Sequence, residues 1–455
     1  MKVVIVGAGE VGFHIAGQLA LENKDVLVID KNAAALRRVS DSLDVQVFQG
    51  SGSSPDILNE AGLRKADILL AVTDSDEANL VACLMADIIA PSITKLARLR
   101  DAVYDDFHDT FRVNAPHIET VINPEIEVVK TIQRMMQVPG AVDVAEFADG
   151  RLVFVGIHLE ENHRFVGVKL EKLPLQSGEE RPLIAAIQRD EELIIPHGKD
   201  RLLAGDLVYF ITQSEKLAQA LEIFHKQVKP LRRALIVGGG RLGYRMALAL
   251  EDQEGVSCKI IEKDPERCEF LAERLNKAVV LLGDGSDQDL LTEENVGDMD
   301  VVITLTKHEE TNILASLLTR RMGARKCITR ISKFSYFPLM QTIGIEQIVS
   351  PRLSAIDSIL QHVRRGKVLS ALSIKGEQAE VLEAVALETS AIVSKPLRDQ
   401  KFPKGALLAG IMRQGQSIIP TGDTVIVPDD HIIIVARREA IPQIEKILAV
   451  ELEFF

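Results

Sequence analysis

Short apolar runs alternate with amphipathic stretches through the first 125 residues of the chain. The runs are apolar throughout, as in strands buried on both faces of a sheet, and the stretches between them repeat their apolar positions with the period of a helix. A helix expected over 77–90 has an apolar stripe through Leu80, Val81, Leu84 and Ile88. The pattern predicts an α/β fold, a doubly wound parallel sheet with strands at 3–6, 26–29, 45–48, 67–72, 93–99 and 118–122.

The character of the sequence changes from Val142 onward. Asn123-Pro124 ends the first sheet, and a helix is expected over 125–136. Short apolar segments separated by turns then predict a small strand-rich module, closed by a helix over 216–226. Lys229-Pro230 marks a domain boundary. The expected strands of the module lie at 152–157, 183–187, 193–196 and 207–211.

The second half of the chain repeats the first. Asn79 matches Asn312 at an offset of 233 positions, and Asn123-Pro124 matches Ser350-Pro351 at an offset of 227. The offset changes where loops and linkers lie, so the sequence predicts two tandem sheet domains, each followed by a small α+β module. The expected boundaries are 1–123 and 231–350 for the sheet domains, 124–137 and 351–366 for linker helices, and 138–228 and 367–455 for the modules.

A G-x-G-x-x-G motif, Gly7 to Gly12, follows the first expected strand and opens the first expected helix. Gly7 permits the tight turn, Gly9 lets the backbone approach a pyrophosphate, and Gly12 lets helix and strand pack closely. Asp30 ends the second strand, where it can accept hydrogen bonds from a ribose diol and would repel a 2′-phosphate. The motif predicts a dinucleotide site that favours NAD over NADP, with the pyrophosphate at the helix N-terminus.

A second copy of this arrangement begins at Gly238. The turn Gly238 to Gly243 again follows an apolar run, and Glu262 takes the position of Asp30 at the end of the next strand. A lone glycine motif is weak evidence, because a glycine turn can join any strand to a helix. Two complete motifs, each with its acid, make coincidence a poor explanation.

Two further pairs of matched positions lie at the carboxyl edge of the sheets, where such folds bind ligands. Thr73-Asp74 and Thr306-Lys307 follow the fourth strand of each copy. They can contact the ribose or adenine of a ligand or act as helix N-caps, and the sequence favours neither role. Arg98 and Arg330 end a buried strand, where a cation needs a partner. A ligand phosphate is slightly favoured as that partner, and a carboxylate of the fold is the alternative.

One matched position reverses its charge beside the pyrophosphate turn. Glu10 in the first copy corresponds to Arg241 in the second. A carboxylate disfavours additional negative charge and a guanidinium attracts it, so we expect the second site to tolerate phosphate-rich nucleotides better than the first.

Composition excludes several classes of function. The formal net charge of −13 argues against binding to nucleic acid, no apolar run approaches a membrane span, and the N-terminus begins with a strand in place of a signal peptide. Four cysteines without CxxC spacing indicate reduced thiols of a cytosolic protein. The histidines have no metal-ligand spacing, and His108 among acidic residues is expected in a solvated loop. No catalytic constellation accompanies the glycine motifs, so nucleotide is expected to be bound and not turned over.

The duplicated motifs GAGEVG and GGGRLG resemble those of the RCK (KTN) domain family, and so do GSGSSPDIL, GDGSDQDLL and VTDSDEANLVA. The resemblance covers essentially the whole chain. It is to the peripheral subunits of Trk-type potassium uptake systems, which carry two Rossmann-like RCK domains in tandem, each with an RCK C-terminal module.

The resemblance implies a cytosolic regulatory subunit on the inner face of the membrane. It implies a ring, usually a homotetramer, that gates a potassium-translocating subunit of the Trk type when NAD, NADH, ATP or ADP changes the ring's shape. No catalytic residue and no metal are implied, and Glu10 departs from the uncharged residue expected there. The implied nucleotide contacts are Gly7, Ala8, Gly9, Glu10, Val11, Gly12, Asp30, Thr73, Asp74 and Arg98, with Gly238, Gly239, Gly240, Arg241, Leu242, Gly243, Glu262, Thr306, Lys307 and Arg330 in the second copy.

Two alternatives stay open at this point. The glycine motifs alone also suit an NAD-dependent oxidoreductase, although fold-level analogy is weak evidence of activity. The second alternative is a nucleotide-sensing regulator of another cation transporter, such as a potassium/proton antiporter. Chains of the antiporter type usually fuse such a domain to a membrane portion, which this sequence lacks.

Overall fold

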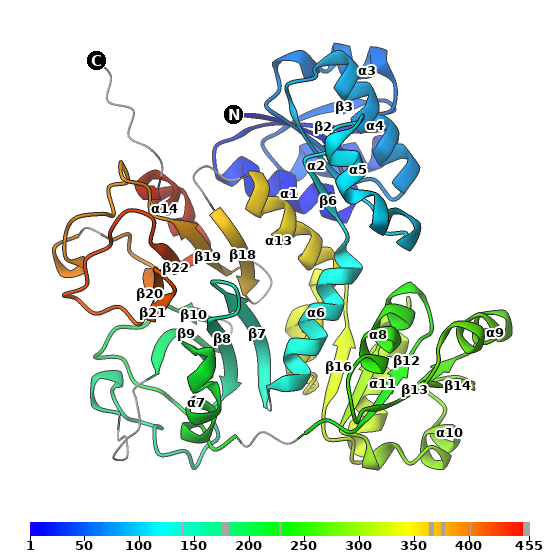
Figure 1. Cartoon of the computed structure of the whole chain (residues 1–455), viewed down its shortest axis with the longest axis vertical. Coiled ribbons are helices and arrows are strands. Elements are labelled where there is room, and N and C mark those ends of the chain that lie inside the picture. The colour runs from blue at the N-terminus through cyan, green and yellow to red at the C-terminus, as the bar shows by residue number, and fades with distance from the viewer. Residues whose placement is uncertain are drawn as a thin grey trace. The chain divides into compact units, whose positions relative to one another are not determined.

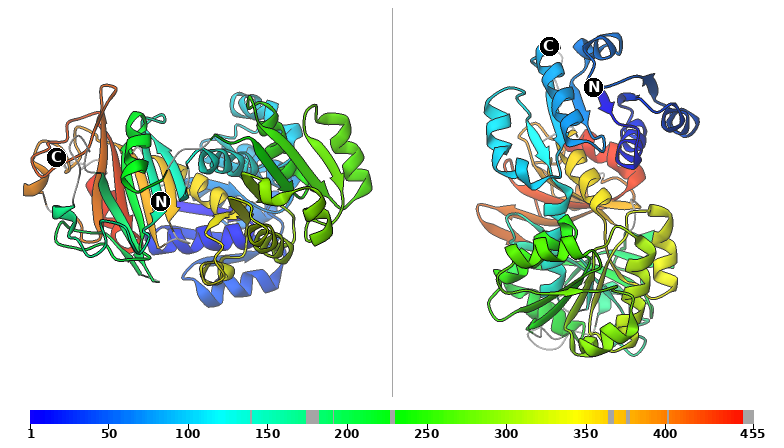
Figure 2. Two further views of the ribbon diagram at one scale, coloured as in Figure 1. Left: turned by 90° about the horizontal axis from the view of Figure 1, so that it is seen from below. Right: turned by 90° about the vertical axis from the view of Figure 1, so that its right-hand side faces the viewer.

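The computed structural model describes residues 1–138, 140–173, 182–190, 192–226, 230–363, 368–374, 378–400 and 402–448 (Figure 1, Figure 2). Its contacts divide the chain into two compact units. The first consists of Met1–Glu127 and Pro351–Arg364, and the second of Val128–Ser350 and Arg365–Phe455. Among the helices that the described residues form, none combines the length and the hydropathy that a bilayer crossing requires.

The first unit is built on a six-stranded parallel sheet with the order β3-β2-β1-β4-β5-β6. Apolar strands occupy its centre, and the last four residues of β1, Val3 to Val6, are buried. The order reverses between β1 and β4, so the loops after these two strands border a topological switch point. This confirms the doubly wound sheet. The strands are β1 (Lys2–Val6), β2 (Asp25–Asp30), β3 (Gln46–Gln49), β4 (Ile68–Ala71), β5 (Thr94–Arg98) and β6 (Thr120–Ile122).

Helices from both halves of the sequence cover this sheet. The helix α13 (Pro351–Val363), which follows the second sheet domain in sequence, packs against α1 and β6 of the first. The other helices of the unit are α1 (Glu10–Leu21), α2 (Ala33–Ser42), α3 (Pro55–Glu60), α4 (Asp76–Ile89) and α5 (His108–Val113). His108 begins α5, so the loop expected around it is wrong.

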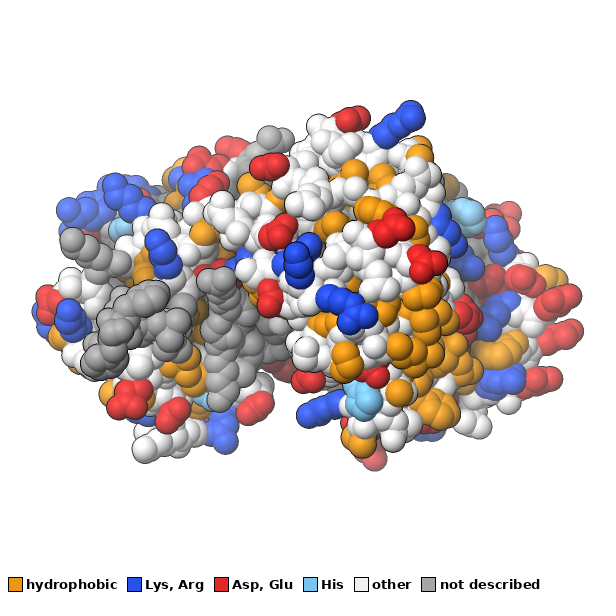
Figure 3. All heavy atoms as spheres, turned by 90° about the horizontal axis from the view of Figure 1, so that it is seen from above, with side chains coloured by type: hydrophobic (Ala, Val, Ile, Leu, Met, Phe, Trp, Pro, Cys, Tyr) orange, Lys and Arg blue, Asp and Glu red, His pale blue; other side chains and the backbone are white. Residues whose placement is uncertain are grey.

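The apolar stripe of α4 lies largely on the exposed side of the helix. Leu80 is half-buried, and the side chains of Val81, Leu84 and Ile88 are 41%, 37% and 67% exposed. Small residues, Ala82 and Ala86 among them, form the buried face, because they let the helix approach the sheet closely. The helix therefore presents an apolar face to solvent within its unit. Figure 3 shows hydrophobic side chains gathered among charged ones on the face of the chain that it draws.

The second unit contains another six-stranded parallel sheet, with the order β14-β13-β12-β15-β16-β17. The duplication is thus confirmed at the level of strand order. The strands are β12 (Arg233–Val237), β13 (Ser257–Glu262), β14 (Val279–Leu282), β15 (Val301–Thr304), β16 (Cys327–Arg330) and β17 (Gln347–Val349). The helices are α8 (Arg241–Glu251), α9 (Pro265–Arg274), α10 (Gln288–Glu293), α11 (Glu309–Arg321) and α12 (Phe337–Thr342).

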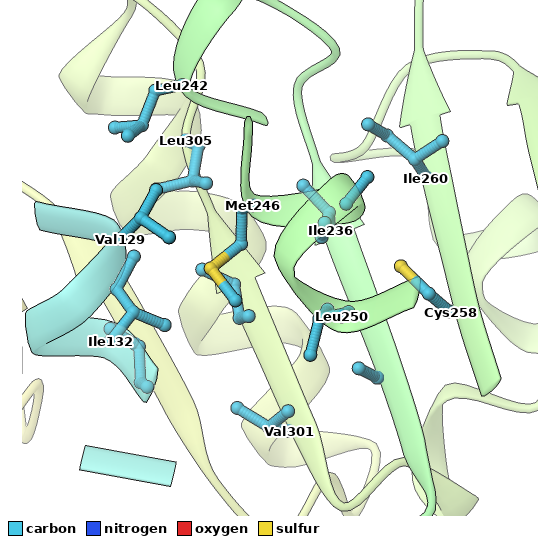
Figure 4. Close-up of a cluster of buried hydrophobic side chains, with 14 of the residues drawn as sticks. Val129, Ile132, Ile236, Leu242, Met246, Leu250, Cys258, Ile260, Val301 and Leu305 are labelled. Carbon is cyan, nitrogen blue, oxygen red and sulfur yellow. The ribbon is translucent and has the colours of Figure 1, made fainter. Parts of the chain in front are cut away.

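The helix α6 (Pro124–Gln137) follows the first sheet domain, but from Val128 onward it packs on the second. Val129 and Ile132 of α6 belong to one buried cluster with Met246 of α8 and Leu305 (Figure 4). Together with α13, this gives an exchange of helices between the two halves of the chain. Each sheet domain is completed by the helix that follows the other one in sequence.

The small modules are five-stranded antiparallel sheets with the orders β10-β9-β11-β8-β7 and β18-β19-β22-β20-β21. One strand, β7, was not expected from the sequence, since Ala, Asp and Glu, which are depleted in strands, occupy much of it. The strands are β7 (Ala141–Phe147), β8 (Leu152–His158), β9 (Leu183–Arg189), β10 (Glu192–Ile194), β11 (Leu207–Gln213), β18 (Val368–Ile374), β19 (Ala379–Val385), β20 (Ala406–Arg413), β21 (Gln416–Ile418) and β22 (His431–Arg437).

The two modules share a core within the second unit. Phe154 and Tyr209 of the first module lie in one buried cluster with Val381 and Val435 of the second. One helix closes each sheet, α7 (Leu217–Ile223) in the first module and α14 (Ile441–Leu448) in the second. The modules therefore pack sheet against sheet as a pair.

Candidate functional site

The first glycine turn has the geometry that its three glycines predict. Gly7 has a φ of +117°, a conformation that favours glycine. A Cβ on Gly12 would lie 1.8 Å from the carbonyl oxygen of Gly7, so only glycine lets α1 pack this closely on β1. The turn and the start of the helix are therefore held together by contacts that any side chain would break.

Gly9 plays a different part in the turn. Its φ of −67° suits any residue, and a Cβ built on it meets no atom within 4 Å. The N-cap residue of α1 is Gly9, so no side-chain hydrogen bond caps the N-terminus of the helix. Exposed N–H groups at the positive end of a helix dipole form an anion site. The described residues therefore leave room for a side chain at Gly9, unlike at Gly7 and Gly12.

Asp30 is held by the glycine turn. One carboxylate oxygen accepts a hydrogen bond from the Ala8 N–H at 2.6 Å, and the other accepts one from the Asn32 N–H at 2.8 Å. An ionised carboxylate offers about four acceptor positions, so two remain for the hydroxyls of a ribose. The acid lies beside the turn before any ligand arrives.

The second copy reproduces this arrangement. Gly238 has a φ of +105°, and a Cβ on Gly243 would lie 1.9 Å from the Gly238 carbonyl oxygen. The Glu262 carboxylate accepts a hydrogen bond of 2.6 Å from the Gly239 N–H. A Cβ on Gly240 meets no atom within 4 Å, as at Gly9. Glutamate in place of aspartate therefore preserves the same contact with the turn.

Thr73 is not the N-cap of the helix that follows it, because Ser75 occupies that position and accepts from the Ala78 N–H. The Thr73 hydroxyl instead donates to the Asn79 Oδ1 at 2.7 Å. The Asn79 amide group also donates to the backbone carbonyl of Arg98 at 2.8 Å. One buried amide thus joins the loops after β4 and β5.

The same bonds recur in the second copy. The Thr306 hydroxyl donates to the Asn312 Oδ1 at 2.7 Å, and the Asn312 amide donates to the Arg330 carbonyl at 3.1 Å. His308 occupies the N-cap position, so the interpretation of Thr306 as the N-cap is wrong as well. Sequence reasoning matched Asn79 with Asn312 but assigned them no role; their recurrence at one offset was the available signal.

Arg98 is paired with a carboxylate of the fold. Its guanidinium donates to Asp74 at 2.8 Å, and burial followed by the charge of Arg100 holds the Arg98 pKa below its usual range. The Asp74 side chain is 91% exposed, so a ligand phosphate can compete for the cation. In the second copy Lys307 replaces Asp74, and Arg330 donates to the Leu305 carbonyl at 3.4 Å.

Sequence reasoning missed a cation in each copy. Arg38 of α2 donates to Glu10 at 2.5 Å and lies over the Phe13 ring at 4.1 Å, and its hydrogen bond lowers the pKa of Glu10. The Arg267 Nε of α9 donates to the Gly239 carbonyl at 2.7 Å. Burial lowers the pKa of Arg267. The two arginines occupy different positions in the repeat, so alignment of the halves gives no signal for them.

The remaining expected contacts are backbone groups. Val11 and Leu242 are each 3% exposed, since their side chains pack into the fold and leave only the N–H for a ligand. Glu10 and Arg241 each begin their helix, beside these groups. Among the residues that the structure describes, no three of His, Cys, Asp and Glu lie close enough to hold a metal ion.

Models of two domain families match the chain twice each. The TrkA-N domain model matches residues 3–124 and 234–351, and the TrkA-C domain model matches 154–225 and 381–449. A curated Trk system potassium uptake protein TrkA from Azorhizobium caulinodans is 36% identical over 458 residues, which cover all of both chains. The chain belongs to the TrkA family.

A second relative agrees with this family, and a solved structure shows a similar fold. The Trk system potassium uptake protein TrkA homolog 2 of Methanosarcina mazei is 38% identical, and the match covers 98% of this chain and 100% of that one. A solved structure of the GsuK channel bound to NAD covers 98% of this chain and 78% of its own, with a TM-score of 0.59 and 17% identity. At that identity the likeness shows the fold alone.

Proposed function

We propose that this chain is the nucleotide-binding regulatory subunit of a Trk-type potassium uptake system. One observation carries the proposal: Asp30 and Glu262 each accept a 2.6 Å hydrogen bond from the glycine turn of their own copy. In each copy a carboxylate thus lies beside a helix N-terminus that has no side-chain cap, which supports a site for ribose and phosphate. Membership of the TrkA family and the bound NAD of the GsuK channel support the same assignment.

The proposed ligand is NAD, NADH, ATP or ADP. Its phosphates lie on the N–H groups at the start of α1 or α8, over Gly9 or Gly240, where a Cβ would meet no atom. The ribose hydroxyls bond to the acid that ends β2 or β13. The loops that begin at Thr73 and Thr306 complete the site beside the base.

The two sites differ in charge. Glu10 and Asp74 in the first copy correspond to Arg241 and Lys307 in the second. Arg38 pairs with Glu10, whereas in the second copy the guanidinium of Arg267 lies on the glycine turn itself. The first site therefore suits a dinucleotide of low charge, and the second suits a nucleotide with more phosphate groups.

Regulation requires only that ligand binds two conformations unequally. We place the chain in a cytoplasmic homotetrameric ring, docked on the inner face of the membrane through a potassium-translocating subunit of the Trk type. The exposed apolar face of α4, with Val81, Leu84 and Ile88, supports assembly with a second copy of the chain, since apolar patches of this kind mark protein contacts. No nucleic acid partner enters the proposal.

The proposed role is not enzymatic. An NAD-dependent oxidoreductase is the second candidate, on the evidence of the glycine turns. Hydride transfer to a small carbonyl compound, followed at 340 nm and lost in Asp30→Ala, would establish it.

Potassium uptake in cells tests the proposal. A strain without this protein should take up potassium poorly, and the wild-type chain should restore uptake. Asp30→Ala should restore it without its nucleotide response, while Asp25→Ala, at the opposite end of the same strand, should behave as wild type. Uptake and nucleotide response that persist without the protein would refute the proposal.

A further inference from the structure

A cavity of about 560 Å³ lies in the second unit, at the edge of the sheet opposite the glycine turn. It is lined by the first residue of three strands: Val301 of β15, Cys327 of β16 and Gln347 of β17. The glycine turn, by contrast, follows Val237, the last residue of β12. The cavity is therefore separate from the proposed nucleotide site and has the volume usual for a small-molecule pocket.

Basic side chains dominate its lining. The acidic members are Asp300 and Glu346, and Asp300 is already engaged by the Arg232 and Arg233 N–H groups at 2.8 and 2.9 Å and by Arg325. The basic members are Arg320, Arg325, Lys326, His225 and Lys226. Lys226 is paired with Glu160 at 2.6 Å, so Arg320 and Lys326 supply most of the remaining positive charge. This charge favours an anionic occupant.

Lys326 is a partly buried cation of this lining. Its ammonium donates to the carbonyl oxygens of Met135 and Val138, at the end of α6. Burial alone lowers the Lys326 pKa to about 8, with no carboxylate acting against it. Carbonyl groups satisfy its hydrogen bonds but do not neutralise its charge, which an anion in the cavity would do.

At the corresponding edge of the first sheet, a carboxylate of the fold neutralises the charge of a buried lysine. The buried Lys95 ammonium donates to Asp87 at 2.8 Å, and Asp87 also contacts His117 at 2.9 Å. In the repeat Arg320 corresponds to Asp87, at the offset of 233 that relates Asn79 to Asn312. The strand pairing matches Lys95 to Cys327 and not to Lys326. The second copy has thus replaced both members of this ion pair, and Arg320 in place of Asp87 lines the cavity.

We propose that this cavity binds a phosphorylated small molecule, with the phosphate held by Arg320 and Lys326. A guanidinium presents paired N–H donors to phosphate, and the buried ammonium supplies a point charge beside it. Met136 of α6 and His225 after α7 line the same cavity. The ligand would thereby join the second sheet domain to the first module, at a site that does not depend on the glycine turns.

Calorimetric titration of the full chain tests this site. The protein carries Asp30→Ala and Glu262→Ala to weaken the glycine-turn sites, and the probes are inorganic phosphate and AMP. At least one probe should bind saturably, and Arg320→Gln and Lys326→Gln should each weaken it at least tenfold. Arg321→Gln, an exposed neighbour outside the cavity lining, is the matched control and should change nothing.

The two probes distinguish the sources of phosphate. Tighter binding of AMP indicates an organic phosphate, and equal binding indicates inorganic phosphate. Failure of both probes to bind, or affinities that neither Arg320→Gln nor Lys326→Gln alters, would overturn the proposal. Failure of the glycine turns to bind nucleotide would leave this result unaffected, so the two proposals can fail separately.

Discussion

The Asp30 carboxylate accepts a 2.6 Å hydrogen bond from the backbone N–H of Ala8, in the middle of the first glycine turn. Gly239 and Glu262 repeat the bond at the same length, although the acid there is one methylene longer. In the proposed site, the groups that bind ribose and phosphate are thus parts of one hydrogen-bonded element. A ligand that reaches the turn meets an acid already in position, which lowers the ordering cost of binding.

Substitutions at two glycines of the turn should affect stability differently. Gly12→Ala should lower the free energy of unfolding by about 1–3 kcal/mol, since its Cβ would lie 1.8 Å from the Gly7 carbonyl oxygen. Gly9→Ala should change it by less than about 0.5 kcal/mol, because open space surrounds that position. Chemical denaturation without ligand measures both.

The nucleotide affinity of Gly9→Ala should fall although its stability does not. Gly9→Ala should weaken binding while the fold stays intact, because its methyl group enters the space assigned to phosphate. A Gly9→Ala protein that is both stable and unchanged in nucleotide affinity would show that the pyrophosphate lies elsewhere.

Assembly should depend on the exposed face of α4. Ile88→Glu puts a charge on a side chain that is 67% exposed in the single chain and should reduce the oligomer to smaller species. Arg321→Glu is the control, since Arg321 occupies the corresponding position on α11. Light scattering after size exclusion measures both, and an intact oligomer in Ile88→Glu would exclude this face from the interface.

Stability should rise with pH through the titration of Lys326. Its pKa is about 8 in the folded chain and near 10.5 in the unfolded one, so the unfolded state binds the proton more readily. The unfolding free energy of wild type relative to Lys326→Met should be constant below pH 8 and increase from pH 8 to about 10.5. The charged groups that share its cavity are Arg320, Arg325, His225, Lys226, Asp300 and Glu346.

Denaturation of the two proteins across this pH range provides the measurement. A difference in stability that does not change with pH would show that the ammonium is solvated in the folded chain. Saturating phosphate should reduce the pH dependence, because an anion raises the folded-state pKa.

The charge reversal between the sites predicts opposite ligand preferences. With Glu262→Ala only the first site should bind, and NADH should bind it more tightly than ATP. With Asp30→Ala only the second site should bind. The affinity for ATP relative to NADH should be higher there, because Arg241 and Lys307 replace carboxylates. Titration of each variant with both ligands measures these affinities. The same ratio of NADH affinity to ATP affinity in the two variants would contradict the prediction.

Sequence patterns predicted the parts of the fold that depend on local signals. The six strands of the first sheet, the glycine turns and the duplication are confirmed, since buried parallel strands and G-x-G-x-x-G turns have strong local patterns. The contact of Asp30 with the turn also follows from strand order, because the ends of β1 and β2 lie side by side.

Other features depend on tertiary contacts that periodicity does not encode. The apolar stripe on α4 does not tell which face of the helix packs on the sheet, and small residues such as Ala82 and Ala86 belong to the buried face. The exchange of α6 and α13 was not anticipated, because a linker helix can complete either neighbouring domain. The cation beside Glu10 was missed, since Arg38 comes from a separate helix.

Ligand-dependent thermal stability of the purified chain tests the central claim, that both glycine turns bind nucleotide. NAD, NADH, ATP and ADP are compared on wild type, Asp30→Ala, Glu262→Ala and the control Asp25→Ala. A ligand at 100 times its dissociation constant should stabilise a site by about 2.7 kcal/mol. The account predicts that each acid variant loses part of this stabilisation and that Asp25→Ala loses none. Stabilisation by no nucleotide, or equal stabilisation of all four proteins, would contradict it.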